Sequence, residues 1–115
     1  MTETAIDPAI FSELEDSAGA DFVRELVQTF LEEAPAMLQA LQAALATGDA
    51  EAFRRNAHSL KSNSLTFGAL ALGAQARALE LGGLPAAQAA SAALDALGTE
   101  WARVAAALQE RLRHD

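Results

Sequence analysis

The sequence contains no cysteine and no tyrosine, and it has only one tryptophan and five phenylalanines. Without cysteine there is no disulfide framework and no thiolate metal site, and the two histidines cannot build a zinc cluster alone. No run of about 18 apolar residues predicts a membrane span. The N-terminus, Met1 to Ala5, lacks the basic start and apolar core of a signal peptide. We therefore expect no metal site, no membrane partner and a cytoplasmic protein.

Basic residues are also scarce, at eight against 16 acidic ones, for a formal net charge of −8. Nucleic acids and anionic membranes select basic surfaces, so this balance argues against both as partners. Within the acidic background, Arg54, Arg55 and Lys61 cluster around His58. A solvated helix face is the simplest interpretation of such a cluster from charge alone.

What the chain has in abundance is alanine and leucine at helical spacing. Its 115 residues are enough for about one domain, so we expect residues 1–115 to form one. Helix-start and break signals predict these segments: a short helix from Asp7-Pro8, a long one over 21–47, a third from Asp49 to Gly68, a shorter one over 69–81, and a last long one after Gly82-Gly83-Leu84-Pro85. Short links make neighbouring helices antiparallel. The expected fold is all-α: an antiparallel four-helix bundle with a short N-terminal capping helix.

The third segment carries a histidine that lies off the apolar face of its helix. On a helical wheel of about 100° per residue with Phe53 at zero, the residues of the buried stripe fall within about 40° of Phe53. That stripe consists of Phe53, Ala57, Leu60, Ser64 and Phe67. His58 lies at about 140°, and the solvent-facing stripe around it holds Arg54, Lys61, Ser62 and Leu65.

Several kinds of site do not fit this histidine. A di-metal bundle needs Glu-x-x-His pairs that project inward, but Arg55 stands three residues before His58. No glycine-rich phosphate loop is present for ATP, and serines beside the histidine on one helix do not create a hydrolytic cleft. The stripe instead suits an exposed imidazole that receives and releases a charged group. Lys61 can offset phosphoryl charge and the small Ser62 leaves room above the ring, while a partner supplies Mg²⁺.

These residues resemble the signature of the histidine-containing phosphotransfer (HPt) domain family. In that family, Ala-His-x-Leu-Lys-Gly-small-small leads to a glycine ten residues after the histidine. The corresponding stretch here is Ala57-His58-Ser59-Leu60-Lys61-Ser62-Asn63-Ser64, with Phe67-Gly68-Ala69 after it. Three further segments are similar to family members: Glu32-Glu33-Ala34-Pro35, Gly48-Asp49 and Leu79-Glu80. The main departure is Ser62, where the family usually has glycine.

The resemblance implies a phosphorelay intermediate in two-component signalling. His58 would be the phosphoacceptor, Lys61 would support the phosphoryl group, and Gly68 would allow the close turn. Phosphoryl would pass reversibly between His58 and an aspartate on a response-regulator receiver domain, with a hybrid histidine kinase as a further partner. We expect a monomer with no autokinase or ATPase activity and no cofactor, and Mg²⁺ only in the partner receiver domain. Ser62 keeps its position small but limits how closely a partner backbone approaches.

A partner would dock on exposed apolar side chains near His58. Leu65 is the first candidate, because it lies on the solvent stripe, although burial under the fourth helix is the alternative. Arg54, as part of the basic cluster, is another. Phe22 either packs against the first helix or contacts a partner, and Ile10 and Leu14 are weaker candidates.

Two other functions remain open at this point. A non-catalytic helical adaptor would bind a receiver domain or kinase without being phosphorylated. The dimerisation and phosphoacceptor domain of a histidine kinase would have an acidic residue directly after the histidine and an ATP domain further on. Ser59 and the chain end at Asp115 argue against that domain, and Met1 leads us to expect a free protein.

Overall fold

The computed structural model describes residues 5–84 and 87–114 and contains five helices. They are α1 (Pro8–Ala18), α2 (Ala20–Thr47), α3 (Ala50–Thr66), α4 (Leu70–Gly82) and α5 (Ala87–His114). The described residues include no β-strand, so the all-α prediction is confirmed. None of the helices in this part of the chain has the length and apolar character needed to cross a membrane.

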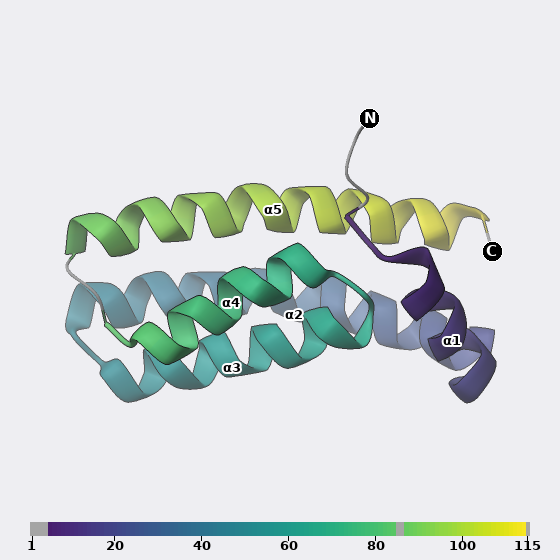
Figure 1. Cartoon of the computed structure of the whole chain (residues 1–115), viewed down its shortest axis with the longest axis horizontal. Helices are drawn as coiled ribbons and strands as arrows, with labels where there is room; N and C mark the ends of the chain where they lie inside the picture. Colours follow the sequence, from purple (N-terminus) through teal and green to yellow (C-terminus); the bar gives the residue numbers. More distant parts are fainter. Residues whose placement is uncertain (1–4, 85–86, 115) are drawn as a thin grey trace.

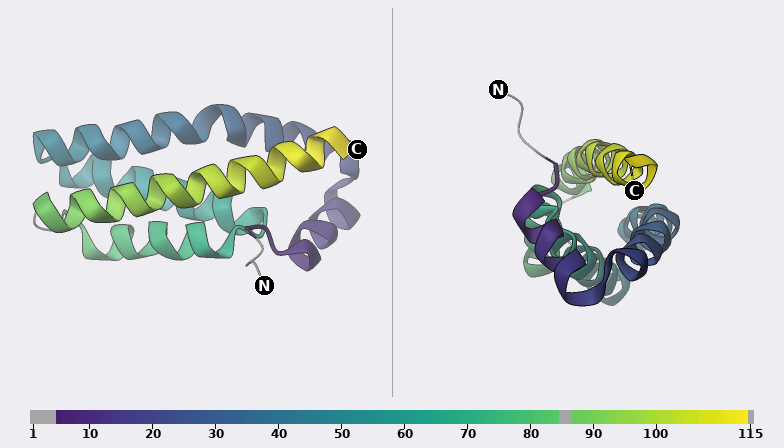
Figure 2. Two further views of the ribbon diagram at one scale, coloured as in Figure 1. Left: turned by 90° about the horizontal axis from the view of Figure 1, so that it is seen from above. Right: turned by 90° about the vertical axis from the view of Figure 1, so that its right-hand side faces the viewer.

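Helices α2 to α5 form the predicted antiparallel bundle, and α1 covers one end of it (Figure 1). α2 packs on α3 and α5, and α4 packs on the same two helices from the other side. The end-on view in Figure 2 shows this ring of four, with α1 lying in front of one side of it. Since α3 and α4 are consecutive neighbours, they form an antiparallel hairpin with one face turned away from α5.

Two aspartates start helices as the sequence predicts. The carboxylate of Asp7 accepts hydrogen bonds from the backbone N–H groups of Ala9, at 2.9 Å, and Ile10, at 3.3 Å. Asp49 likewise accepts one from Ala52, at 3.0 Å. Each bond satisfies an N–H group that has no partner within the helix. These caps fix where α1 and α3 begin.

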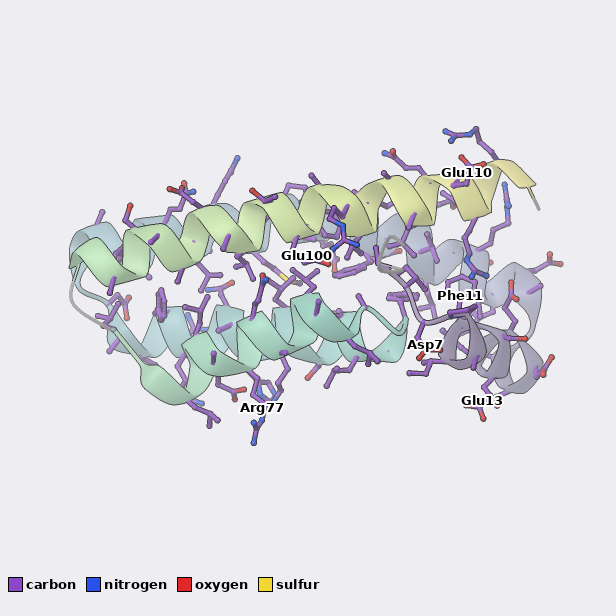
Figure 3. All side chains as sticks on the ribbon, turned by 45° about the horizontal axis from the view of Figure 1, so that its top comes forward. Asp7, Phe11, Glu13, Arg77, Glu100 and Glu110 are labelled. Atoms are coloured by element: carbon purple, nitrogen blue, oxygen red, sulfur yellow. The ribbon has the colours of Figure 1, made fainter. Side chains whose placement is uncertain are left out.

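Aromatic side chains hold α1 to the end of the bundle. The Phe30 ring stacks on Phe67 with centroids 5.3 Å apart and meets Trp101 edge-on at 5.2 Å. Phe11 of α1 lies 6.5 Å from Phe67, and the guanidinium of Arg111 in α5 lies 4.3 Å from the Phe11 ring centroid. Figure 3 shows Phe11 in this position below the C-terminal part of α5. One cluster therefore joins α1, α2 and α5 to Phe67, the residue that ends α3.

Gly68 makes the turn that follows α3. Its φ of +84° is in the left-handed region that glycine adopts without steric cost. The backbone N–H of Asp7 donates to the Gly68 carbonyl at 2.8 Å. A Cβ atom on Gly68 would lie 3.0 Å from the Asp7 carbonyl oxygen and 3.1 Å from the Ile10 Cβ. The turn and the start of α1 therefore leave no room for a side chain.

We predict that Gly68→Ala lowers the free energy of unfolding by about 1–3 kcal/mol, because it adds strain at a positive φ and crowds the Asp7 backbone. Gly98→Ala is the matched control, since Gly98 lies inside α5 with nothing within 4 Å of an added Cβ. That change should stabilise the protein by about 0.5–1 kcal/mol. Urea unfolding of both variants measures the two effects, and changes of the same sign would contradict this account of the turn.

Candidate functional site

His58 lies on the exposed side of α3, with 54% of its side chain accessible. The buried residues of the same helix are Phe53, Ala57, Leu60 and Ser64. Since these four face the interior, the helix presents the imidazole outward, where the helical pattern predicts it. The ring is anchored on rigid structure and open to a partner.

A carboxylate on α4 joins the two principal site residues of α3. Glu80 Oε2 lies 2.7 Å from His58 Nδ1, and Glu80 Oε1 lies 2.8 Å from Lys61 Nζ. Only 14% of the Glu80 side chain and 22% of the Lys61 side chain are exposed. The three side chains therefore form one network, with the imidazole as its most accessible member.

The charge on Glu80 determines which imidazole nitrogen carries a proton. The hydrogen bond from Lys61, and after it the bond from His58, lower the pKa of the Glu80 carboxyl, against a smaller opposing effect of burial. The group is therefore ionised at neutral pH, and an ionised carboxylate only accepts hydrogen bonds. Nδ1 must then donate to Oε2, which in the neutral imidazole leaves the lone pair on Nε2.

Close contact between α3 and α4 continues two turns beyond His58. A Cβ on Gly73 of α4 would lie 2.6 Å from the Leu65 Cδ2 and 3.7 Å from the Ser64 Cβ. The missing side chain lets Leu65 lie against α4, yet 43% of Leu65 stays exposed. Leu65 therefore packs on the fourth helix and still faces solvent, and its role as a docking residue stays a prediction.

Two further α3 candidates, Ser62 and Arg54, lie one turn to either side of His58. Ser62, one turn after His58, is exposed and small, so no larger side chain covers the ring from that position. Arg54, one turn before His58, is also exposed, and it pairs with Glu51 at 2.6 Å. Its charge is therefore already offset within its own helix, as that of Lys61 is offset by Glu80.

The other predicted docking residues lie toward the α1 end of the bundle. Phe22 is 53% exposed at the start of α2, so it is not buried against α1. Ile10 is partly buried and lies beside Gly68, and Leu14 is partly buried against the core. Gly68 follows His58 by ten residues, which is about 15 Å along a helix. The structure therefore groups Lys61, Ser62 and Leu65 with His58 and places Ile10, Leu14 and Phe22 further away.

Neither Glu80 nor Gly73 was identified from the sequence as a contact of the α3 residues, although the hairpin contains a signal for both. The turn centres on residue 69, and His58 and Glu80 are each 11 residues from it. Leu65 and Gly73 are each four residues from it. Residues at equal distance from the turn of an antiparallel hairpin lie at the same level, so counting outward from Ala69 finds both contacts.

Among residues 5–84 and 87–114, no three histidine, cysteine, aspartate or glutamate side chains gather as metal ligands would. The site in the described part of the chain therefore consists of an imidazole, an ammonium group and one carboxylate. This set can hold a proton on Nδ1, offer the Nε2 lone pair and place positive charge nearby.

We predict that Glu80→Gln destabilises the protein at neutral pH and that this difference disappears in acid. Because the Glu80 pKa is lowered in the folded state, its stabilising contribution is present above the unfolded carboxyl pKa of about 4.3 and is lost as the pH falls below it. Urea unfolding of wild type and variant from about pH 6 to about pH 3 measures the difference. Glu33→Gln, at an exposed site on α2, is the control. A wild-type advantage that stays constant over this range would contradict the prediction.

Comparison with known proteins identifies the family and the fold of the chain. The Hpt domain model matches residues 25–112. The fold superimposes with a TM-score of 0.85 on the crystal structure of histidine-containing phosphotransfer protein B (HptB) from Pseudomonas aeruginosa PAO1, at 27% sequence identity and over 99% of each chain. A search of curated proteins found no match. The chain therefore belongs to the Hpt domain family, and its role is phosphotransfer in two-component signalling.

Proposed function

We propose that His58 accepts a phosphoryl group on Nε2 from the phosphoaspartate of one receiver domain and passes it reversibly to another. The observation that carries this proposal is the bond between His58 Nδ1 and the Glu80 carboxylate, at 2.7 Å. It accounts for a proton on Nδ1 and a lone pair on the exposed nitrogen. The alternative, an adaptor that only binds its partner, gives no role to this arrangement.

The transfer step follows from these positions. The Nε2 lone pair forms the N–P bond while the P–O bond to the aspartate breaks, and that electron pair returns to the aspartate carboxylate. The ring then carries a positive charge with its proton still on Nδ1, and Glu80 Oε2 stabilises that charge. In the reverse direction, the carboxylate of a second receiver attacks phosphorus and the N–P electron pair returns to Nε2.

Lys61 supports the phosphoryl group in this proposal. Its ammonium lies three residues after His58, and long side chains on a helix lean toward the N-terminus, which here means toward the imidazole. Lys61 already shares Glu80 with His58, with Nζ 2.8 Å from the other carboxylate oxygen. A phosphoryl group on Nε2 therefore competes with Glu80 for this ammonium.

The partners supply the rest of the chemistry. We expect a hybrid histidine kinase and response-regulator receiver domains as partners, with Mg²⁺ held by the receiver domain. We also expect the protein to be a cytoplasmic monomer with no autokinase or ATPase activity. Phosphoryl transfer depends mainly on positioning and charge stabilisation, so a chain that contributes a nucleophile can rely on its partner for the metal. Leu65 would be the main apolar contact near His58, with Arg54, Phe22, Ile10 and Leu14 as further ones.

We predict that His58→Gln abolishes acceptance of phosphate from a receiver domain phosphorylated with acetyl phosphate. Wild type should gain acid-labile, alkali-stable label, because the N–P bond of phosphohistidine hydrolyses in acid. The variant should gain none, while its thermal unfolding stays close to wild type since the side chain is exposed. Equal labelling of both proteins would contradict the proposal, and binding without label in wild type would favour the adaptor.

A further inference from the structure

The hairpin that sets the His58–Glu80 contact also fixes the position of Arg77. His58 and Glu80, and likewise Leu65 and Gly73, lie at equal distances from residue 69. By the same count Arg77 is level with Lys61 on the facing helix. Arg77 therefore lies between the levels of His58 and Leu65, beside the site but on α4.

Arg77 belongs to an exposed stripe along the outer side of α4. At about 100° per residue, Leu70, Ala74, Arg77 and Leu81 fall within about 60° of one another. All four are exposed, and Leu70 and Leu81 are 47% and 69% accessible. Figure 3 shows the Arg77 side chain projecting from α4 away from α5. This stripe and the exposed α3 residues His58 and Leu65 form one surface across the two helices.

The charge of Arg77 is available to a partner. Within the part of the chain that the structure describes, no ion pair or hydrogen bond engages its side chain. Lys61 is bound to Glu80, and Arg54 is bound to Glu51. With respect to residues 5–84 and 87–114, Arg77 is thus an unpaired cation next to the site, in a protein whose net charge is −8.

The chemistry of the partner explains why an unpaired cation is needed there. A domain that carries a phosphoaspartate and holds Mg²⁺ surrounds its reactive group with carboxylates. A protein with a net charge of −8 repels such a group of carboxylates unless its contact surface carries local positive charge. An apolar stripe with a cation beside His58 provides both complementary charge and area for a partner to cover.

We infer that the receiver domain docks across both helices of the hairpin and not on α3 alone. The α4 part of the contact consists of Leu70, Arg77 and Leu81, and Arg77 binds the carboxylates that surround the reactive group of the receiver domain. This inference rests on the proposed function and adds to it a surface outside the histidine-bearing helix. Arg77 acts here on association, because it reaches the partner's surface and not the reacting atoms.

The test measures transfer kinetics from a receiver domain of the source genome, phosphorylated with acetyl phosphate, to the full chain. Arg77→Ala should raise the KM for the phosphorylated receiver about three- to tenfold at low salt, with Arg77→Glu showing a larger effect and kcat within about twofold of wild type. The increase should shrink at about 0.5 M salt because surface charges are then screened. Leu81→Ser should raise KM at both salt concentrations.

Arg113→Ala is the matched control, because it removes an exposed arginine near the far end of α5, a helix that does not pack on α3. Its KM should match that of wild type. If the Arg77 and Leu81 variants also match wild type, the receiver docks without α4 and the inference is wrong. That result differs from failure of the proposed function, in which wild type itself accepts no phosphate.

Discussion

The site depends on one carboxylate of α4 that two side chains of α3 share. Glu80 binds the imidazole of His58 through one oxygen and the ammonium of Lys61 through the other, at 2.7 and 2.8 Å. The carboxylate keeps a proton on Nδ1 and leaves the lone pair of the neutral imidazole on Nε2. In the transfer that we propose, it also stabilises the ring once it becomes positive. Lys61 in turn lowers the pKa of Glu80 and keeps it ionised, so the protonation of the imidazole depends on all three side chains together.

The bundle holds that carboxylate level with the imidazole and within hydrogen-bond distance of it. The turn at Gly68, which has a φ of +84°, sets the register of α3 against α4. The hydrogen bond from the Asp7 N–H to the Gly68 carbonyl connects this turn to the start of α1. Gly73 lets the two helices approach where Leu65 crosses. The aromatic cluster around Phe30 and Phe67 then fixes the end of the hairpin in the core. Packing far from His58 therefore contributes to the geometry at the imidazole.

Local patterns were sufficient to predict the helices and the exposed histidine. Asp7 and Asp49 cap helices where the sequence signals place them, and the periodicity around Phe53 places His58 on the outer side. These features depend on residues within a turn or two of one another. The bundle followed from them because short links leave antiparallel packing as the compact arrangement.

Contacts between helices were harder to predict. The Glu80 contact joins residues 22 positions apart and requires the register of the hairpin, which periodicity within one helix does not contain. For the same reason, the pattern within α3 leaves the environment of Leu65 open between solvent and burial, and in the structure it packs on α4 while 43% of it stays exposed. Phe22 had two possible environments because its position at the edge of the apolar stripe does not reveal where α1 crosses. The structure leaves it exposed.

The most direct test of the central claim is the tautomer of His58 in the free protein. Long-range ¹H–¹⁵N correlation spectra, recorded at a pH where the imidazole is neutral, distinguish the protonated ring nitrogen from the one that carries the lone pair. The shared carboxylate predicts a proton on Nδ1 and a lone pair on Nε2 in wild type, and a shift toward the other tautomer in Glu80→Ala. A proton on Nε2 in the wild-type protein would contradict the account.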